Sequence, residues 1–287
     1  MVLLAILFAF GIAIGSFLNV LILRYEGEGL FSPSRLSGRS MCPHCHGQLA
    51  WHDLIPVLSF AWLMGRCRLC RARISFQYPL VELATAFAFV LLATHFYPHY
   101  LFPDPHPYPF LMAAGWGVIL VSLIALAAID MRLMLIPNEL SGLIAMVGIA
   151  FAALDQAAAF SDSFLGNYAF LFPHTSQPLL DHVAGGAIGL ALLGLIVLLS
   201  RGRAMGMGDV KLAGAMGLVL GFPDIVFALA FSFLAGGAWG VGLVLLRLGR
   251  ARATMRSMIP FGPFLVAGFL VHIFFGHALF AWYFSLL

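Results

Sequence analysis

Apolar residues in this chain gather in long stretches that are separated by polar connections. A helix needs about 20 apolar residues to cross a bilayer, and eight stretches reach or approach that length. They cover residues 2–23, 79–97, 110–130, 136–154, 182–200, 208–222, 224–246 and 261–284. The sixth stretch is short, and only the turn-forming residues 221–224 separate it from the seventh. Hydropathy alone therefore also permits six or seven spans.

The composition places the chain among membrane proteins. Hydrophobic residues make up 62% of the 287 residues and charged residues 9%, with a mean hydropathy of +1.00. A soluble domain would carry roughly 25% charged residues, so a very large soluble core is excluded. Residues 1–23 lack the basic start and the clear cleavage site of a signal peptide, and we expect a retained span there. The net charge of +3 is too small to suggest nucleic acid as a partner.

The basic residues predict how the spans are oriented. All 15 Lys and Arg residues lie in alternate connections: within 24–78, after the third span, around the start of the sixth, and before the eighth. Loops rich in Lys and Arg stay in the cytoplasm, so we expect these connections to be cytoplasmic. Eight spans with both termini outside fit this pattern, and an odd number of spans would break it.

All four cysteines lie in the predicted cytoplasmic loop, as two C-x-x-C pairs. Cys42 pairs with Cys45, and Cys67 pairs with Cys70. This spacing is typical of a tetrahedral zinc site, and the reducing cytoplasm disfavours structural disulfides. Four thiolates leave no open coordination position, so we expect the zinc to be structural. The alternatives are four unligated thiols or a redox pair.

Two aspartates lie at the cytoplasmic ends of predicted spans. Asp130 closes the third span, and Asp209 opens the sixth. Ionisable groups at membrane depth are costly and usually functional. Two carboxyl groups that share a proton can cleave a peptide bond, because one takes a proton from water while the other donates to the scissile carbonyl oxygen. The pair therefore predicts an aspartyl protease. Two separate helix caps, or the ion sites of a transporter, are the alternatives.

Neighbouring residues fit the protease hypothesis. Gly206 and Gly208 remove side chains from the approach to Asp209, or permit a sharp turn there. Lys211 is placed to bias the charge of the pair or to bind an acidic substrate group, and Glu139 is a candidate helper near Asp130. The sequence contains no G-x-S-x-G or H-E-x-x-H motif that would favour another protease mechanism.

Together these patterns predict an all-α polytopic membrane protein. It would have about eight transmembrane helices and a small cytoplasmic four-cysteine zinc-binding loop after the first helix. We expect the first transmembrane helix at residues 1–23, the zinc-binding subdomain at 24–78 and a multi-helix membrane peptidase domain at 79–287.

Seven segments carry a family resemblance, in order along nearly the whole chain. They are GSFLNV at 15–20, the two cysteine pairs counted as one motif, WHDLIP at 51–56, ISFQYPLVE at 74–82, the segment 130–137, GMGDVKL at 206–212 and IPFGPF at 259–264. This series resembles the motifs of the type IV prepilin peptidases. These are GxGD-type intramembrane aspartyl proteases, also called prepilin leader peptidase/N-methyltransferases.

The resemblance implies removal of short basic leader peptides from type IV prepilins or type II secretion pseudopilins. Cleavage would occur on the cytoplasmic side of the bacterial inner membrane, with Asp130 and Asp209 matching the catalytic aspartates of the family. The resemblance also implies N-methylation of the new N-terminal residue, with S-adenosylmethionine as methyl donor. The partners would be these prepilin substrates and membrane lipid, without nucleic acid.

Some positions depart from the family pattern near the cysteine loop. His52, Leu54 and Gln77 stand where the family usually has Tyr, Asn and Arg. A peptidase without methyltransferase activity is therefore an alternative. Glu82 and Asp53 are the candidates for methyl transfer or for binding the substrate amine. The other interpretation of Glu82 is an interfacial acid paired with a nearby arginine.

Overall fold

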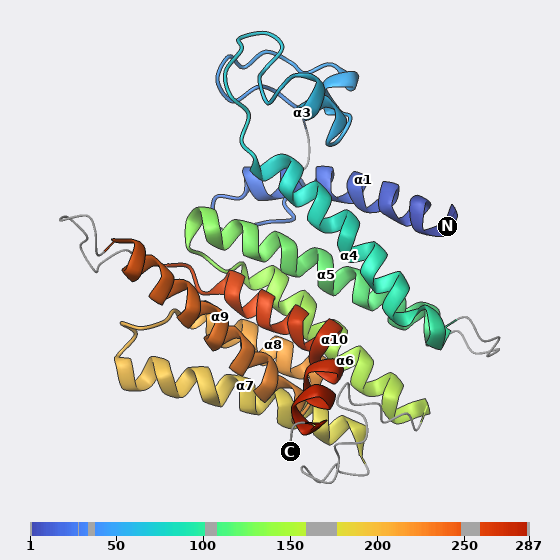
Figure 1. Ribbon diagram of the computed structural model, residues 1–287, viewed down its shortest axis with the longest axis vertical. Helices are drawn as coiled ribbons and strands as arrows, with labels where there is room; N and C mark the ends of the chain where they lie inside the picture. Colours follow the sequence, from blue (N-terminus) through green and yellow to red (C-terminus); the bar gives the residue numbers. More distant parts are fainter. Residues whose placement is uncertain are drawn as a thin grey trace. The chain divides into compact units, whose positions relative to one another are not determined.

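The computed structural model describes residues 2–27, 29–33, 38–100, 108–158, 177–247 and 259–285. Three connections lie outside the described residues, namely 101–107, 159–176 and 248–258. The last of them contains several of the arginines in the predicted cytoplasmic loops. The described part of the chain is all-α, as predicted, with two isolated β-bridges and no strand (Figure 1). Its helices are α1 (Val2–Arg24), the short helix η1 (Trp51–Leu54), α3 (Leu58–Trp62), α4 (Gln77–Tyr100), α5 (Tyr108–Leu133), α6 (Asn138–Ala158), α7 (Pro178–Ser200), α8 (Met207–Leu220), α9 (Asp224–Arg247) and α10 (Gly262–Ser285).

Every apolar stretch predicted from the sequence coincides with a helix. Among the described residues, six helices are long and apolar enough to cross a membrane, namely α1, α4, α5, α6, α7 and α9. In α10, the described apolar part runs from Gly262 to Gly276. The chain is therefore a multi-pass membrane protein. Helix α8 has 14 residues, which gives a length of about 21 Å against a hydrocarbon core of about 30 Å.

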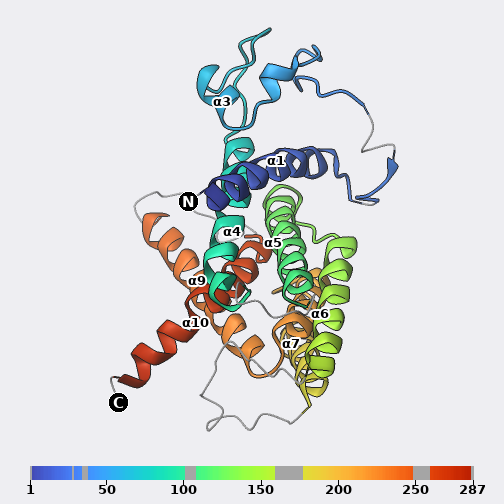
Figure 2. The same ribbon diagram turned by 90° about the vertical axis from the view of Figure 1, so that its right-hand side faces the viewer.

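Two compact units make up the chain, Met1–Ile129 and Asp130–Leu287. The boundaries expected after residues 23 and 78 both fall inside the first unit and stay predictions. In the first unit, α1 packs antiparallel against α4 (Figures 1 and 2). A Cβ atom on Gly15 would come within 2.6 Å of the Cα of Glu82. Small residues allow such a close approach of two membrane helices.

Helix α8 forms the core of the second unit. Helices α6, α7, α9 and α10 all contact it, and most of its residues are buried. Its backbone meets that of α7 directly, because a Cβ atom on Gly217 would come within 2.5 Å of the carbonyl carbon of Gly185. The predicted turn at 221–224 is confirmed as the break between α8 and α9. At this turn the amide of Phe222 donates a hydrogen bond to the carbonyl of Asp181 at 2.9 Å.

Candidate active site and metal centre

Asp130 lies in the last turn of α5, and its side chain is buried. The backbone N–H of Gly262, the first residue of α10, donates a hydrogen bond to its Oδ2 at 2.9 Å. A Cβ atom on Gly262 would stand 2.6 Å from the same oxygen. The start of α10 thus contacts the carboxyl group through its backbone, where the helix N-terminus favours a negative charge.

Asp209 lies in the first turn of α8 and is also buried. The N–H of Gly206 donates a hydrogen bond to its Oδ2 at 3.2 Å. Its Oδ1 is buried and has no hydrogen-bond partner within the described residues. The carboxyl groups of Asp130 and Asp209 are close enough to interact electrostatically. Both predicted aspartates thus belong to the second unit and lie within electrostatic reach of one another.

The two glycines beside Asp209 have different surroundings. Gly206 has a φ of −84°, which any residue adopts, and its contribution is the N–H that binds the carboxylate. Gly208 packs against the connection between α5 and α6, because a Cβ atom there would come within 2.9 Å of the Cβ of Ile136. Gly208 thus allows the close packing of α8 against this connection.

Lys211 is exposed and reaches the start of α6. Its Nζ donates a hydrogen bond to Oδ1 of Asn138 at 3.0 Å. Glu139 follows Asn138 in the first turn of α6 and is partly exposed. Both residues stand on helix starts that border the aspartate pair, and their roles as helpers stay predictions.

The four cysteines lie in two knuckles of matching geometry, residues 41–48 and 66–73. In the first, the amide of His46 donates to the carbonyl of Cys42 at 2.9 Å. In the second, the amide of Arg71 donates to the carbonyl of Cys67 at 3.0 Å. His46 and Arg71 both have the positive φ that the tight turn requires, 52° and 60°. Each knuckle is closed by an antiparallel bridge, Met41 with Gln48 and Arg66 with Arg73.

The four cysteine sulfurs are placed to hold a metal ion. All four lie within 4.8 Å of one another, and Sγ of Cys42 stands 3.8 Å from Sγ of Cys70. A tetrahedral zinc site with Zn–S bonds of ~2.3 Å separates its sulfurs by about 3.8 Å. The backbone N–H of Cys45, with a smaller effect from that of His44, lowers the pKa of the Cys42 thiol from 9.0 to about 6. At Cys42 the thiolate, which is the form that binds metals, is thereby favoured at neutral pH. Although the backbone N–H of Ala72 acts to lower it, without a metal burial and the neighbouring thiols raise the pKa of Cys70 to about 11.

Two family models and several curated relatives match this chain. Residues 9–96 match the Bacterial Peptidase A24 N-terminal domain, and residues 117–241 match the Type IV leader peptidase family. The chain is 32% identical to a prepilin leader peptidase/N-methyltransferase of Aeromonas hydrophila, over 97% of this chain and 93% of the relative. It is 33% identical to the protein so named in Bacillus subtilis (strain 168), over 98% of this chain and 97% of the relative. The chain belongs to the type IV leader peptidase family. No solved structure matches it significantly.

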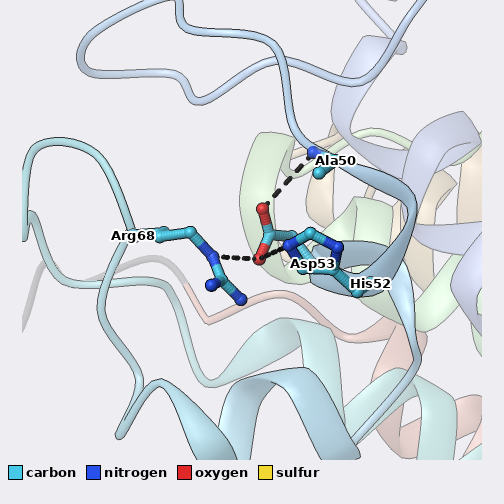
Figure 3. Close-up of polar contacts among 4 residues, drawn as sticks. All are labelled: Ala50, His52, Asp53 and Arg68. Atoms are coloured by element: carbon cyan, nitrogen blue, oxygen red, sulfur yellow. Dashed lines mark hydrogen bonds and ion pairs between the residues drawn. The ribbon is translucent and has the colours of Figure 1, made fainter.

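In this family member, the carboxyl group of Asp53 is bound within the cysteine loop (Figure 3). The Nε of Arg68 donates a hydrogen bond to its Oδ1 at 2.7 Å, and the N–H of Ala50 donates to its Oδ2 at 3.3 Å. Arg68 lies between Cys67 and Cys70, so Asp53 links η1 to the second knuckle. A part for Asp53 in methyl transfer stays a prediction.

Glu82 lies one and a half turns into α4, and it is buried. Its Oε2 accepts a hydrogen bond from the N–H of Val57 at 2.8 Å. Val57 precedes α3 and has a positive φ of 60°. Ser16 of α1 also interacts with this carboxyl group. Glu82 therefore ties the cysteine loop to the helix that follows it, and its part in methyl transfer stays a prediction.

Several structural partners were not foreseen from the sequence. The motif at 259–264 was noticed, but no local signal shows that its Gly262 would meet Asp130. Asp224 belongs to the predicted turn 221–224. It is buried, and its Oδ1 lies 3.1 Å from Nε2 of His272 in α10. A histidine within the apolar stretch 261–284 was the available signal, because a buried imidazole needs a polar partner.

Proposed function

We propose that this chain cleaves the leader peptide of type IV prepilins or type II secretion pseudopilins, with Asp130 and Asp209 as the catalytic pair. The observation that supports the proposal is that these two carboxyl groups are buried in the same unit, within electrostatic reach of one another. Membership of the family supports the substrate class, since relatives of similar length are named prepilin leader peptidases.

The mechanism follows from a pair of carboxyl groups that shares one proton. The ionised group accepts a proton from a water molecule while the oxygen of that water attacks the scissile carbonyl carbon. The protonated group donates to the carbonyl oxygen, and a tetrahedral intermediate forms. Its collapse breaks the C–N bond as the leaving amine takes up the proton that the first group accepted from water, and a hydroxyl of the intermediate returns a proton to the second group. Each aspartate has one oxygen held by a backbone N–H, from Gly262 or Gly206, which fixes the direction of its second oxygen.

We place this reaction at the cytoplasmic face of the bacterial inner membrane. The predicted cytoplasmic connections are those that carry the Lys and Arg residues. The connection after α5 and the one before α8 both belong to this set, and they flank Asp130 and Asp209.

The four-cysteine site is proposed to hold structural Zn²⁺. The sulfur separation within the loop fits the tetrahedral thiolate shell of that ion. Such a shell has no position for substrate, so zinc would hold the two knuckles together. These knuckles have almost no apolar core of their own, with Cys42 and Cys67 as their buried residues.

N-methylation of the new N-terminal residue is the second proposed activity, with S-adenosylmethionine as donor. Its support is the name of the relatives. The hollow beside α3 is open and carries Arg66 and Arg73, whose positive charges oppose the sulfonium of the donor. We therefore assign no residues to donor binding. A peptidase without this second activity is the alternative, favoured by the departures at His52, Leu54 and Gln77.

Co-expression with a prepilin, followed by mass spectrometry of the pilin, tests these assignments. Asp130→Asn and Asp209→Asn should each lower processing by about 100-fold or more, because each removes a proton-transfer group. Asp155→Asn is the matched control, since the carboxyl group of Asp155 binds His182 in the same unit. Full processing by either folded catalytic variant would refute the pair.

The same spectra distinguish the second activity. Cleaved pilin from the unmodified enzyme should carry one added methyl group on its N-terminal residue. Complete cleavage without that mass would leave the peptidase alternative. If prepilin stays uncut by the unmodified enzyme, the ion-site alternative for Asp130 and Asp209 becomes the one to pursue.

A further inference from the structure

Large apolar side chains project from the first unit on both sides of the second knuckle, from α3 and the residues after it and from the residue before α4. Leu58 is 67% exposed, Trp62 86%, Met64 83% and Phe76 79%. Leu58 and Trp62 are four residues apart on α3 and share a face. Met64 and Phe76 line one open hollow of ≈ 430 Å³. Exposed apolar patches of this kind mark contact with a partner or with a membrane.

Two contacts hold this surface at the beginning of a membrane-crossing helix. Phe76 directly precedes α4, whose residues 77–94 are long and apolar enough to cross. Its ring lies 5.3 Å from that of Phe60 in α3. The start of α3 is fixed independently by the hydrogen bond from Val57 N–H to Glu82. Glu82 lies about 7.5 Å along α4 from its first residue, so α3 stands at the level where α4 enters the membrane.

The charges beside Met64 and Phe76 are positive. Arg66 and Arg73 line the same hollow as Met64 and Phe76, and both are exposed. In the described ranges of the chain neither forms an ion pair with an acid. Arginine beside aromatic side chains suits the boundary between acyl chains and phosphate groups. Anionic lipids of the cytoplasmic leaflet attract such residues.

We propose that this surface, formed by Leu58, Trp62, Met64, Phe76, Arg66 and Arg73, docks onto the anionic phospholipid surface of the membrane that α4 crosses. The apolar side chains enter the acyl boundary, and the two arginines bind lipid phosphates. The cysteine loop is thereby held against the bilayer by this contact as well as by its covalent connections to α1 and α4. A basic leader peptide is a poorer occupant, because Arg66 and Arg73 would repel it. The proposal is independent of the peptidase assignment.

The test uses the full-length protein in lipid nanodiscs that contain phosphatidylglycerol and no prepilin. Trp62 fluorescence is obtained as the difference between the unmodified protein and Trp62→Phe. Because Trp62 is 86% exposed, this variant should fold, and its zinc content verifies that. Phospholipid brominated near the top of its acyl chains should quench most of the Trp62 emission, while aqueous iodide should leave most of it. Quenching by iodide without quenching by brominated lipid would overturn the proposal.

Charge variants test the anionic part of the proposal. Arg66→Gln combined with Arg73→Gln should reduce the lipid quenching of Trp62 in phosphatidylglycerol nanodiscs to the level seen with phosphatidylcholine alone. Arg71→Gln is the matched control, since Arg71 is exposed in the same knuckle but does not line the hollow. Equal effects of the control and the double variant would refute binding of anionic headgroups. Shielding of Trp62 from iodide that appears only after prepilin is added would assign the surface to the substrate and overturn the lipid proposal.

Discussion

At the scale of single residues, Gly262 has the most restrictive surroundings near the aspartate pair. Its N–H binds Oδ2 of Asp130 at 2.9 Å, and a Cβ atom would stand 2.6 Å from that oxygen. Atoms at that separation overlap, so any side chain must displace either the carboxyl group or the start of α10. Glycine fits here because it lacks a Cβ atom. The backbone φ at this position is one that other residues also adopt.

Gly262→Ala should therefore lower prepilin processing by about 100-fold, the effect of moving a reacting group by ~1 Å. The rate of processing of a prepilin by purified enzyme measures this. Gly142→Ala in α6 is the control, because no atom lies within 4 Å of its added Cβ. It should keep the original rate. A Gly262→Ala variant as active as this control would contradict a positioning role for Gly262.

At the scale of elements, the cysteine loop is held mainly by short-range contacts and by its sulfurs. Its two knuckles repeat one hydrogen-bond pattern around Cys42 and Cys67. The bond between Arg68 and Asp53 then joins the second knuckle to η1 (Figure 3). Because Arg68 in this ion pair is half exposed, the pair contributes only about 1 kcal/mol. The metal proposed for the four-cysteine site should therefore supply most of the folding free energy of the loop.

Cys42→Ser combined with Cys67→Ser should remove the proposed zinc and make the loop sensitive to protease. Each substitution takes away a buried thiolate ligand, and two remaining sulfurs bind zinc weakly. Zinc per chain, measured by elemental analysis, and limited proteolysis provide the readouts. His44→Ala should retain the metal, since the four sulfurs already complete the shell. Undiminished zinc in the double serine variant would refute the four-cysteine assignment.

At the scale of the whole molecule, the number of crossings decides where the C-terminus lies. The placement of basic residues requires an even number, with both termini outside. Helix α8 has 14 residues, and its crossing depends on the helices that surround it rather than on its own length. If α8 did not cross, seven crossings would place the termini on opposite sides.

We predict that a reporter fused after Leu287 will be located outside the cytoplasm. Alkaline phosphatase, which is active only outside, should show activity at this position, and a green fluorescent protein should not fluoresce there. Fusion after Arg203, between α7 and α8, is the control and should give the opposite result. Fluorescence at the C-terminus would show an odd number of crossings and place α8 outside the set of spans.

The sequence by itself determined the class of the protein, its helices and its cysteine site, because these depend on local patterns. Apolar stretches of about 20 residues define membrane helices without reference to their neighbours. Two cysteines three residues apart likewise turn into a knuckle by local geometry, as Cys42 and Cys45 do. Family motifs in the sequence connect Asp130 and Asp209 to the proposed chemistry.

The tertiary structure alone decided which distant residues meet. Gly262 reaches Asp130 across 132 positions of sequence, and Glu82 reaches Val57 across 25. Hydropathy describes α8 as a short span, whereas its packing makes it the buried core of the second unit. Such contacts depend on which helix faces pack together, and small residues at many positions allow several packings. The physical reason is that burial and backbone hydrogen bonds between distant segments are settled only when all the helices of a unit are in place.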